Sequence, residues 1–397
     1  MFEQVRLQHW TRQVQRQLVL PLRIELWNGQ QIDLSPAPPR VTLRIPAPAA
    51  LRYLFSPSLD QLGRAYVEGL IEVRGRAADM IQIVTELARA SLRPGRSVTR
   101  LLRHTRARDA AAIRYHYDVS NDFYAAWLDR NMVYSCAYFE HGDETLGAAQ
   151  LKKIDHILAK IALQPGQRLL DVGCGWGALV LRAAERYGAR CLGITLSENQ
   201  AALARARVAE AGLGHLIEIR LQDYRDVRGE FERITSVGMF EHVGLANLAS
   251  YFAHLRSLLA PGGIIMNHGI TSTSVDARDA PYGGGRFIDE YVFPHGELAH
   301  IGTVLQAMQE GGLEARDVEN LRRHYARTCS LWAERFEAAG EQLHSLVDAR
   351  RYRIWRVYLA GCAYAFAHDW VSLYQVVCGR AGEGPEGMPW SRRYMYA

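Results

Sequence analysis

The alternation of short apolar runs with helical spacing between residues 150 and 270 constrains the fold of this chain more than any other feature. Helical segments separate most of the strand-like runs, which lie at 168–172, 191–194, 217–221, 233–237 and 263–266. Strands that alternate with helices predict a parallel sheet covered by helices on both faces. We therefore predict an α/β fold with a Rossmann-like sheet. A mixed, mostly helical segment is expected after residue 270, with a loosely packed tail over 381–397.

The first 108 residues follow a different pattern, typical of a smaller α+β domain. Asn28-Gly29 separates apolar runs at 22–27 and 31–34, which is a strong signal for a β-hairpin. A third strand is predicted at 41–45, and helical periodicity covers 58–73 and 77–92. The chain of 397 residues is long enough for two domains. We predict an N-terminal domain over 1–108, basic linker included, and a second domain over 109–397.

The composition excludes several classes of protein. Apolar residues make up 48% and charged residues 22% of the chain, which excludes wholesale disorder, collagen and coiled coil. No apolar run is long enough to predict a membrane-spanning helix, and the polar start does not resemble a signal peptide. Six scattered cysteines without a C-x-x-C pair favour reduced thiols in a cytosol and show no zinc-site spacing. We therefore expect a cytoplasmic protein with no metal site.

The positive charge is concentrated at the N-terminal end. Residues 1–109 hold 17 Arg and 9 acidic residues, a balance of +8, whereas the whole chain carries +5. Between Arg89 and Arg108 there are seven Arg and no acidic residue. This segment is a solvated linker helix, a patch that rests on anionic lipid head groups, or a nucleic-acid contact, although no nucleic-acid-binding motif accompanies it.

A glycine-rich loop, Asp171-Val-Gly-Cys-Gly-Trp-Gly177, follows the first strand of the predicted sheet and opens a helix. Glycines at this place let a ligand approach the backbone closely. A structural turn and an NAD site both remain alternatives. S-adenosylmethionine is favoured because Asp171 suits a cationic amino-acid group and because the second strand has no acidic residue at its very end to bind an adenosine ribose.

With these motifs in place, the sequence resembles the cyclopropane-fatty-acyl-phospholipid synthases and the mycolic acid cyclopropane synthases. The resemblance covers about residues 110–380, and the N-terminal 108 residues resemble, more weakly, the lipid-handling domain of the phospholipid branch. The matching stretches are YHYDVSNDF (115–123), YSCAYF (134–139), LLDVGCGWG (169–177), QDYRD (222–226), MFEHVG (239–244), NHGI (267–270), YART (325–328) and YLAGCA (358–363).

The resemblance implies a class I S-adenosylmethionine-dependent methyltransferase fold. It also implies an enzyme that adds a methylene group across the cis double bond of an unsaturated phospholipid acyl chain, forming a cyclopropane ring. An alkene is a poor nucleophile, so the sulfonium methyl group must lie close to it in a dry pocket. The general base implied is a bound bicarbonate. The catalytic residues implied are Cys136, Glu241, His268, Ile270 through its backbone, Tyr325 and Cys362.

Each of these residues also has a structural interpretation. Glu241 could cap a helix or contact the cofactor, His268 could be a hydrogen-bonded core histidine, and Tyr325 could pack between helices. A buried thiol is common, so Cys136 could be a small core residue. Methyl transfer to an alkene needs no covalent enzyme intermediate, which favours a structural role for Cys362.

The cofactor-binding residues implied by the resemblance follow the ends of successive strands. Tyr134 and Ser135 are expected to close over the sulfonium end. The predicted set is Tyr134, Ser135, Asp171, Gly173, Cys174, Gly175, Thr195, Leu196, Ser197, Gln200, Gln222, Asp223 and Tyr224.

Three other functions stay open. The same fold and cofactor could give a methyl- or methylene-branched acyl chain or methylate a small molecule, and a non-catalytic lipid-binding module could keep a vestigial loop. The partners expected are phospholipids at an anionic membrane surface, with the protein peripheral to the inner face, and a second copy in a homodimer; nucleic acid is not expected as a partner. The segment 274–286, with Gly283-Gly-Gly285, matches no motif and is interpreted as a lid or a surface loop.

Overall fold

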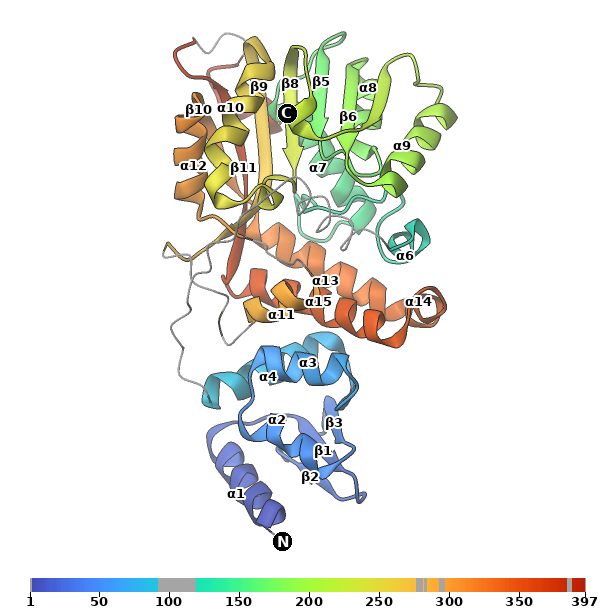
Figure 1. Cartoon of the computed structure of the whole chain (residues 1–397), viewed down its shortest axis with the longest axis vertical. Coiled ribbons are helices and arrows are strands. Elements are labelled where there is room, and N and C mark those ends of the chain that lie inside the picture. Colours follow the sequence, from blue (N-terminus) through green and yellow to red (C-terminus); the bar gives the residue numbers. More distant parts are fainter. Residues whose placement is uncertain are drawn as a thin grey trace. The chain divides into compact units, whose positions relative to one another are not determined.

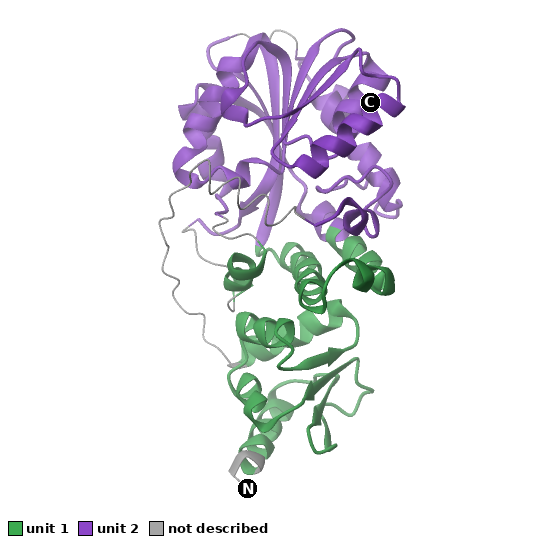
Figure 2. Cartoon of the chain, turned by 45° about the vertical axis from the view of Figure 1, so that its right-hand side comes forward, with its two compact units in different colours: residues 1–100, 278–294, 329–370 green, residues 101–277, 295–328, 371–397 purple. Residues whose placement is uncertain are grey.

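The computed structural model in Figure 1 describes residues 2–91, 119–275, 281, 284–292, 297–383 and 388–396. The chain divides into two compact units (Figure 2). The first unit comprises residues 1–100, 278–294 and 329–370, and the second comprises 101–277, 295–328 and 371–397. The predicted single boundary at 108/109 therefore differs from this division, because two later segments join the N-terminal part. Most of the basic segment from Arg89 to Arg108, from residue 92 onward, and the stretch 115–118 lie outside the described residues.

The first unit contains a four-stranded sheet in the order β2-β1-β3-β4. Its strands are β1 (Leu22–Leu26), β2 (Gln31–Asp33), β3 (Val41–Ile45) and β4 (Glu72–Arg74). The predicted hairpin is confirmed, since β1 and β2 pair antiparallel on either side of Asn28-Gly29. The predicted helix over 58–73 is too long. It ends at Val67, Gly69 takes a positive φ of 72°, and the chain then pairs as β4 with β3.

Helices make up the rest of the first unit: α1 (Phe2–Gln17), α2 (Arg52–Phe55), α3 (Leu59–Val67), α4 (Ala77–Ser91), α11 (Gly284–Tyr291), the later part of α13 (Arg322–Ala338), α14 (Gly340–Leu346) and α15 (Ala349–Ala367). The alternative of a surface loop over 274–286 is wrong at its described end, because residues 284–286 belong to α11; the alternative of a lid stays a prediction. The Phe287 ring packs against Gly63 of α3, and the Tyr291 hydroxyl donates to Glu68 at 3.1 Å.

The second unit is built on a seven-stranded sheet in the order β10-β11-β9-β8-β5-β6-β7. Its strands are β5 (Arg168–Val172), β6 (Arg190–Thr195), β7 (Ile217–Leu221), β8 (Phe231–Val237), β9 (Leu259–Ser272), β10 (Leu313–Asn320) and β11 (Val371–Arg380). The five predicted strands all form and pair in parallel. Counted from β5, the order is 3-2-1-4-5-7-6, and β11 is antiparallel to both of its neighbours.

Helices cover both faces of this sheet, as predicted (Figure 1). On one face, α10 (Leu248–Leu258) and α12 (Ile301–Glu310) form a core with residues such as Val172, Ile234 and Ile265. On the other face, α7 (Leu146–Lys160), α8 (Ala178–Tyr187) and α9 (Glu198–Glu210) pack on residues such as Leu169, Cys191 and Met266. Shorter elements are α6 (Asn121–Ala125) and the 3-10 helices η2 (Tyr224–Asp226), η3 (Phe240–His242), η4 (Leu245–Asn247) and η6 (Arg392–Tyr396).

The segment after residue 270 is mixed and mostly helical, as predicted, with α11 to α15 outweighing β10 and β11, two strands that the sequence analysis did not predict. The expectation of a loosely packed tail is wrong at its end. The described end of the tail is docked, since Met395 is buried and its carbonyl lies 3.0 Å from Nδ1 of His156. In the described parts of the chain, we find no helix that is both long and apolar enough to span a membrane.

Candidate active site

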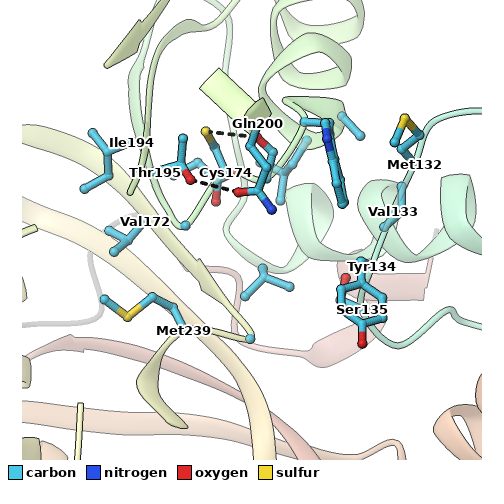
Figure 3. Close-up of a pocket in the computed structure, with 18 of the residues that line it drawn as sticks. Met132, Val133, Tyr134, Ser135, Val172, Cys174, Ile194, Thr195, Gln200 and Met239 are labelled. Carbon is cyan, nitrogen blue, oxygen red and sulfur yellow. Dashed lines mark hydrogen bonds between the residues drawn. The ribbon is translucent and has the colours of Figure 1, made fainter. Parts of the chain in front are cut away.

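A cavity lies in the second unit where the strand order reverses. The sheet continues from β5 to β6 on one side and to β8 on the other, and the residues that follow these three strands line the cavity. Such a reversal leaves a crevice at the carboxyl edge of a parallel sheet, which is where α/β proteins bind their ligands. We call it the strand-end cavity; Figure 3 shows the side chains around it.

The glycine-rich loop forms one wall of the strand-end cavity. Gly173, Gly175 and Gly177 all have positive φ, at 82°, 54° and 83°, so each favours glycine for its backbone conformation. A Cβ on Gly177 would lie 3.2 Å from the Cβ of Ala204, so this glycine also permits close packing of α8 and α9. A Cβ on Gly175 would meet nothing within 4 Å. The space beside Gly175 is therefore left open for a ligand.

Polar groups after β6 form a second wall. The hydroxyl of Thr195 donates to Oε1 of Gln200 at 2.8 Å, and the two side chains lie side by side in Figure 3. Ser197 caps α9 by accepting from the Gln200 backbone N–H at 3.3 Å. The cap and the hydroxyl together fix the Gln200 side chain at the rim of the cavity.

The segment 132–135 lies across the cavity from this wall (Figure 3), and side chains of α7 hold it in place. The buried Gln150 amide donates to the carbonyls of Ser135 at 2.8 Å and Val133 at 3.3 Å. Nζ of Lys153 donates to Oγ of Ser135 at 2.6 Å. The Tyr134 ring packs against Trp127, with ring centroids 5.5 Å apart. This segment is therefore positioned by buried polar and aromatic contacts on both of its sides.

Two opposite charges, Asp171 on β5 and Lys153 on α7, line the strand-end cavity. Burial raises the pKa of Asp171 to about 6, although the Thr235 hydroxyl, 2.7 Å away, stabilises the carboxylate. Burial lowers the pKa of Lys153 to about 8. At neutral pH both groups are mostly ionised, so the cavity offers one negative and one positive group to a ligand.

Glu241 and Ile270 are brought together across η3 and β9. Oε1 of Glu241 accepts from the Ile270 backbone N–H at 2.7 Å. This approach requires glycine at 269, because a Cβ there would lie 1.9 Å from the Phe240 ring. Oε2 of Glu241 is buried and has no hydrogen-bond partner among the described residues. Burial raises the pKa of Glu241 to about 7, against the lowering effect of the Ile270 N–H.

His268, two residues earlier on β9, is fully buried. Its Nδ1 lies 3.1 Å from Nε2 of Gln375 on β11. Because an amide nitrogen only donates, Nδ1 accepts and Nε2 carries the proton. Nε2 has no partner in the part of the chain that the structure describes. Burial and the nearby positive charges of Lys153 and Lys160 lower the pKa of His268 well below its usual value, so the ring is neutral.

Unpartnered buried atoms gather along this strand. We use the name β9 polar cluster for Glu241, Asn267, His268, Thr271 and Gln375. Each has one buried polar atom without a hydrogen-bond partner among the described residues: Glu241 Oε2, Asn267 Oδ1, His268 Nε2, Thr271 Oγ1 and Gln375 Oε1. Because side chains alternate along a strand, Asn267 and Thr271 face the opposite side of the sheet from His268. Native proteins leave few such atoms unpaired, so the unpartnered atoms on each side of the sheet mark a place where a bound group supplies the partners.

The other three predicted catalytic residues have different surroundings. The buried Cys136 thiol lies 3.2 Å from the Ala137 carbonyl and 3.8 Å from that of Leu321, and burial raises its pKa. Tyr325 is nearly buried on the first turn of α13. Cys362 is on α15 of the first unit, where burial raises the pKa of its thiol to about 12. Neither thiol is thus a ready nucleophile at neutral pH.

The structure places eleven of the thirteen predicted cofactor residues around the strand-end cavity: Tyr134, Ser135, Asp171, Gly173, Cys174, Gly175, Thr195, Leu196, Gln200, Gln222 and Tyr224. Ser197 supports the cavity from the α9 cap, and Asp223 instead forms an ion pair with Arg225 at 2.7 Å. The sequence analysis did not single out Lys153 or Met239, which also line the cavity, and it considered His242 only as a possible catalytic residue beside Glu241. The signal for Lys153 was its neighbour Gln150, a polar residue in line with the apolar positions Ile154 and Ile157.

Known proteins match both parts of the chain. Residues 104–376 match the family model described as mycolic acid cyclopropane synthetase, and residues 9–95 match a model described as a domain of unknown function. A probable fatty acid methyltransferase of Pseudomonas putida is 47% identical over 383 residues, 96% of this chain and 97% of that protein. The cyclopropane-fatty-acyl-phospholipid synthase of Escherichia coli (strain K12) is 39% identical over 268 residues, 68% of this chain and 67% of that protein.

A solved structure shares the fold over about two thirds of this chain. The mycolic acid cyclopropane synthase CmaA1, complexed with SAH and CTAB, is 36% identical, with a TM-score of 0.65 over 68% of this chain and 97% of that one. The predicted α/β methyltransferase fold is therefore confirmed.

Proposed function

The chain belongs to the mycolic acid cyclopropane synthetase family, and from that membership we propose that it forms cyclopropane rings in the acyl chains of phospholipids. In general terms the activity is an S-adenosylmethionine-dependent modification of lipid acyl chains. In the specific reaction proposed, a methylene group from the cofactor is added across a cis double bond. The observation that carries this proposal is the β9 polar cluster, which provides buried acid–base groups in the same unit as the strand-end cavity.

The residues of the strand-end cavity fit S-adenosylmethionine. Asp171 offers a carboxylate to its ammonium group, the open space at Gly175 admits a ligand against the backbone, and Gln200 is fixed at the rim. When bound, the cofactor would supply an electrophilic sulfonium methyl group. Apolar side chains, among them Met132 and Met239, line part of the cavity, and an apolar surround with the substrate in place would favour attack by a neutral alkene.

Addition of the methyl group leaves a carbocation, and ring closure requires that a proton leave the transferred methyl. Glu241 suits this step, because a pKa of about 7 lets it hold or release a proton near neutral pH. Neutral His268 presents an N–H donor at Nε2. A protonated carboxyl and an N–H donor together fit a small anion, so we propose bicarbonate as the acceptor held there. The Ile270 N–H, expected to hold the anion, donates to Glu241 in this structure.

A methyl-branched product is the second candidate, favoured by the name of the Pseudomonas putida relative. It differs in how the carbocation is quenched: loss of a different proton leaves an unsaturated or methylene branch, and a saturated methyl branch requires in addition a hydride from a reduced nicotinamide or flavin. We also propose that the substrate lies in an anionic membrane to which the N-terminal part of the chain binds, because that part carries the excess of Arg.

The test is incubation of the purified protein with vesicles of cis-unsaturated phospholipid and methyl-labelled S-adenosylmethionine, followed by lipid analysis. A ring adds a CH₂ unit, whereas a saturated methyl branch carries two more hydrogens, and NMR separates the ring from an isomeric methylene branch. Labelled cyclopropane lipid is expected. A methyl-branched product would establish the second candidate, and no labelled lipid would contradict both. Removal of dissolved bicarbonate should slow turnover, and its return should restore it.

A further inference from the structure

Lys153 has no assigned role, although its side chain reaches the strand-end cavity from α7. We propose that Lys153, together with Ser135, binds the carboxylate of the amino-acid group of S-adenosylmethionine. The inference rests on the cofactor in the proposed function and not on the lipid product. A ligand-binding experiment can therefore test it even if no lipid is modified.

The hydrogen bond between the two residues prepares Ser135 to donate. An ammonium group can only donate, so Oγ of Ser135 accepts from Nζ of Lys153 at 2.6 Å. The Ser135 hydroxyl hydrogen is then left to donate to a second group. Both residues line the strand-end cavity, so a carboxylate there can receive bonds from the hydroxyl and the ammonium.

A second lysine on the same helix shows what is unusual about Lys153. Lys160 is fully buried, two turns further along α7, and it forms ion pairs with Glu319 and with Asp317 at 3.4 Å. Lys153 is also buried, at 2% exposure, but the hydrogen-bond partner that the described chain gives its ammonium is a neutral hydroxyl. A buried ammonium is costly unless an opposite charge compensates it. Burial lowers the pKa of Lys153 while Asp129 and Asp171 raise it by Coulombic attraction, but neither carboxylate forms an ion pair with it among the described residues. A ligand carboxylate would supply that direct contact.

The charges of the cavity match those of the ligand. The amino-acid group of S-adenosylmethionine is zwitterionic, with one ammonium and one carboxylate. Asp171 and Lys153 are the carboxylate and the ammonium that line the cavity within the described residues. If Asp171 takes the ligand ammonium, as predicted from the sequence, Lys153 is left for the carboxylate. Gln150, one turn before Lys153, donates a hydrogen bond to the Ser135 carbonyl at 2.8 Å. This bond keeps Ser135 beside Lys153.

The experiment compares two ligands by calorimetry: S-adenosylhomocysteine and the same thioether without its carboxylate. The wild-type chain is expected to prefer the carboxylate-bearing ligand by about 30-fold, the range for a hydrogen bond to a charged group. In Lys153→Met this preference should fall below about 3-fold, while the affinity for the ligand without a carboxylate stays close to that of the wild type. The matched control is Lys152→Met, which removes the same charge one position away, where Lys152 pairs with Glu140 on the surface. It should keep the full preference.

Ser135→Ala serves as a second probe with little risk to folding, and it should lower the preference about 5-fold. The proposal is overturned if the wild type does not discriminate between the ligands or binds neither. It is also overturned if Lys153→Met keeps the preference, or if it weakens both ligands equally, because the lysine would then only support the fold.

Discussion

The strand-end cavity and the β9 polar cluster use buried polar groups in opposite ways. Around the cavity, Asp171, Lys153 and Thr195 all have hydrogen-bond partners within the protein. Along β9, Glu241 and His268 each keep one buried atom without a partner in the described chain. Paired groups fix a shape, whereas an unpaired buried group costs stability and persists where function requires it. The comparison indicates that the strand-end cavity binds the cofactor and that the β9 polar cluster takes part in the reaction.

The largest effect expected from this division concerns turnover. Glu241→Gln keeps the shape of the side chain but cannot take or release a proton, so turnover should fall about 10²- to 10⁴-fold, the usual contribution of a positioned acid or base. The affinity for S-adenosylhomocysteine should change less than about 3-fold. Single-turnover rates and calorimetry on the same preparation measure the two quantities. Equal losses of turnover and of affinity would mean that Glu241 binds the cofactor, and the strand-end cavity and the β9 polar cluster would then not differ in role.

The same substitution should change stability in a pH-dependent way. The pKa of Glu241 is about 7 in the folded chain, against a usual 4.5, so the folded state binds a proton that the unfolded state releases between these values. Below pH 4.5 the carboxyl is protonated in both states and costs nothing; as pH rises through 7, folding has to bury a charge.

Glu241→Gln removes that cost. The variant should therefore gain about 1–3 kcal/mol over the wild type at pH 8 and almost nothing at pH 4.5. Urea unfolding at the two pH values checks this. A gain that is the same at both pH values would mean that the carboxylate is not buried as the structure has it.

A smaller effect, on the affinity of the strand-end cavity for its ligand, is expected at the glycine-rich loop. Gly175→Ala should lower the affinity for S-adenosylhomocysteine about 10-fold, because the new methyl group enters the open space of the cavity and the positive φ of 54° is strained. Gly188→Ala is the matched control. Gly188 ends α8 with a φ of 61° and likewise has nothing within 4 Å of a built Cβ, so it tests the strain without the cavity. Equal affinity losses in both variants would show that strain alone matters.

The sequence predicts the centre of the sheet well because each of its strands carries its own apolar run. Residues 168–172 and 217–221 match β5 and β7 at both ends. The strand β9 extends over 259–272, far beyond the predicted 263–266, because pairing with β8 and β11 continues through polar residues such as Asn267. The strand β11 was missed because its neighbours in the sheet are distant in sequence.

The site was predictable to the extent that its residues follow strands. Glu241 comes after β8 and Ile270 lies on β9, and neighbouring parallel strands bring their carboxyl ends together, so the contact between these residues could be anticipated. Lys153 and Gln375 could not be found in this way. Lys153 lies in line with the apolar positions of α7, as Gln150 does, so its burial follows from the helical spacing and not from the strand ends.

The smallest effect concerns two threonines on adjacent strands, and it tests the meaning of an unpaired atom most directly. Thr235 on β8 donates to Asp171 at 2.7 Å, whereas Oγ1 of Thr271 on β9 is buried without a partner among the residues described. Replacing each by valine keeps the shape and removes the hydroxyl. Thr235→Val should lower the free energy of unfolding by about 1–3 kcal/mol, because it leaves a buried carboxylate short of a donor.

Thr271→Val should instead be neutral or stabilising by up to about 1 kcal/mol, since it removes a buried hydroxyl that the folded chain does not satisfy. If Thr271 faces a bound group during the reaction, this variant should fold at least as stably as the wild type and still turn over more slowly. A loss of stability as large as that of Thr235→Val would mean that Oγ1 is bonded after all. Thr271 would then be an ordinary hydrogen-bonded core residue. Only Glu241 and His268 would still distinguish the β9 polar cluster from the strand-end cavity.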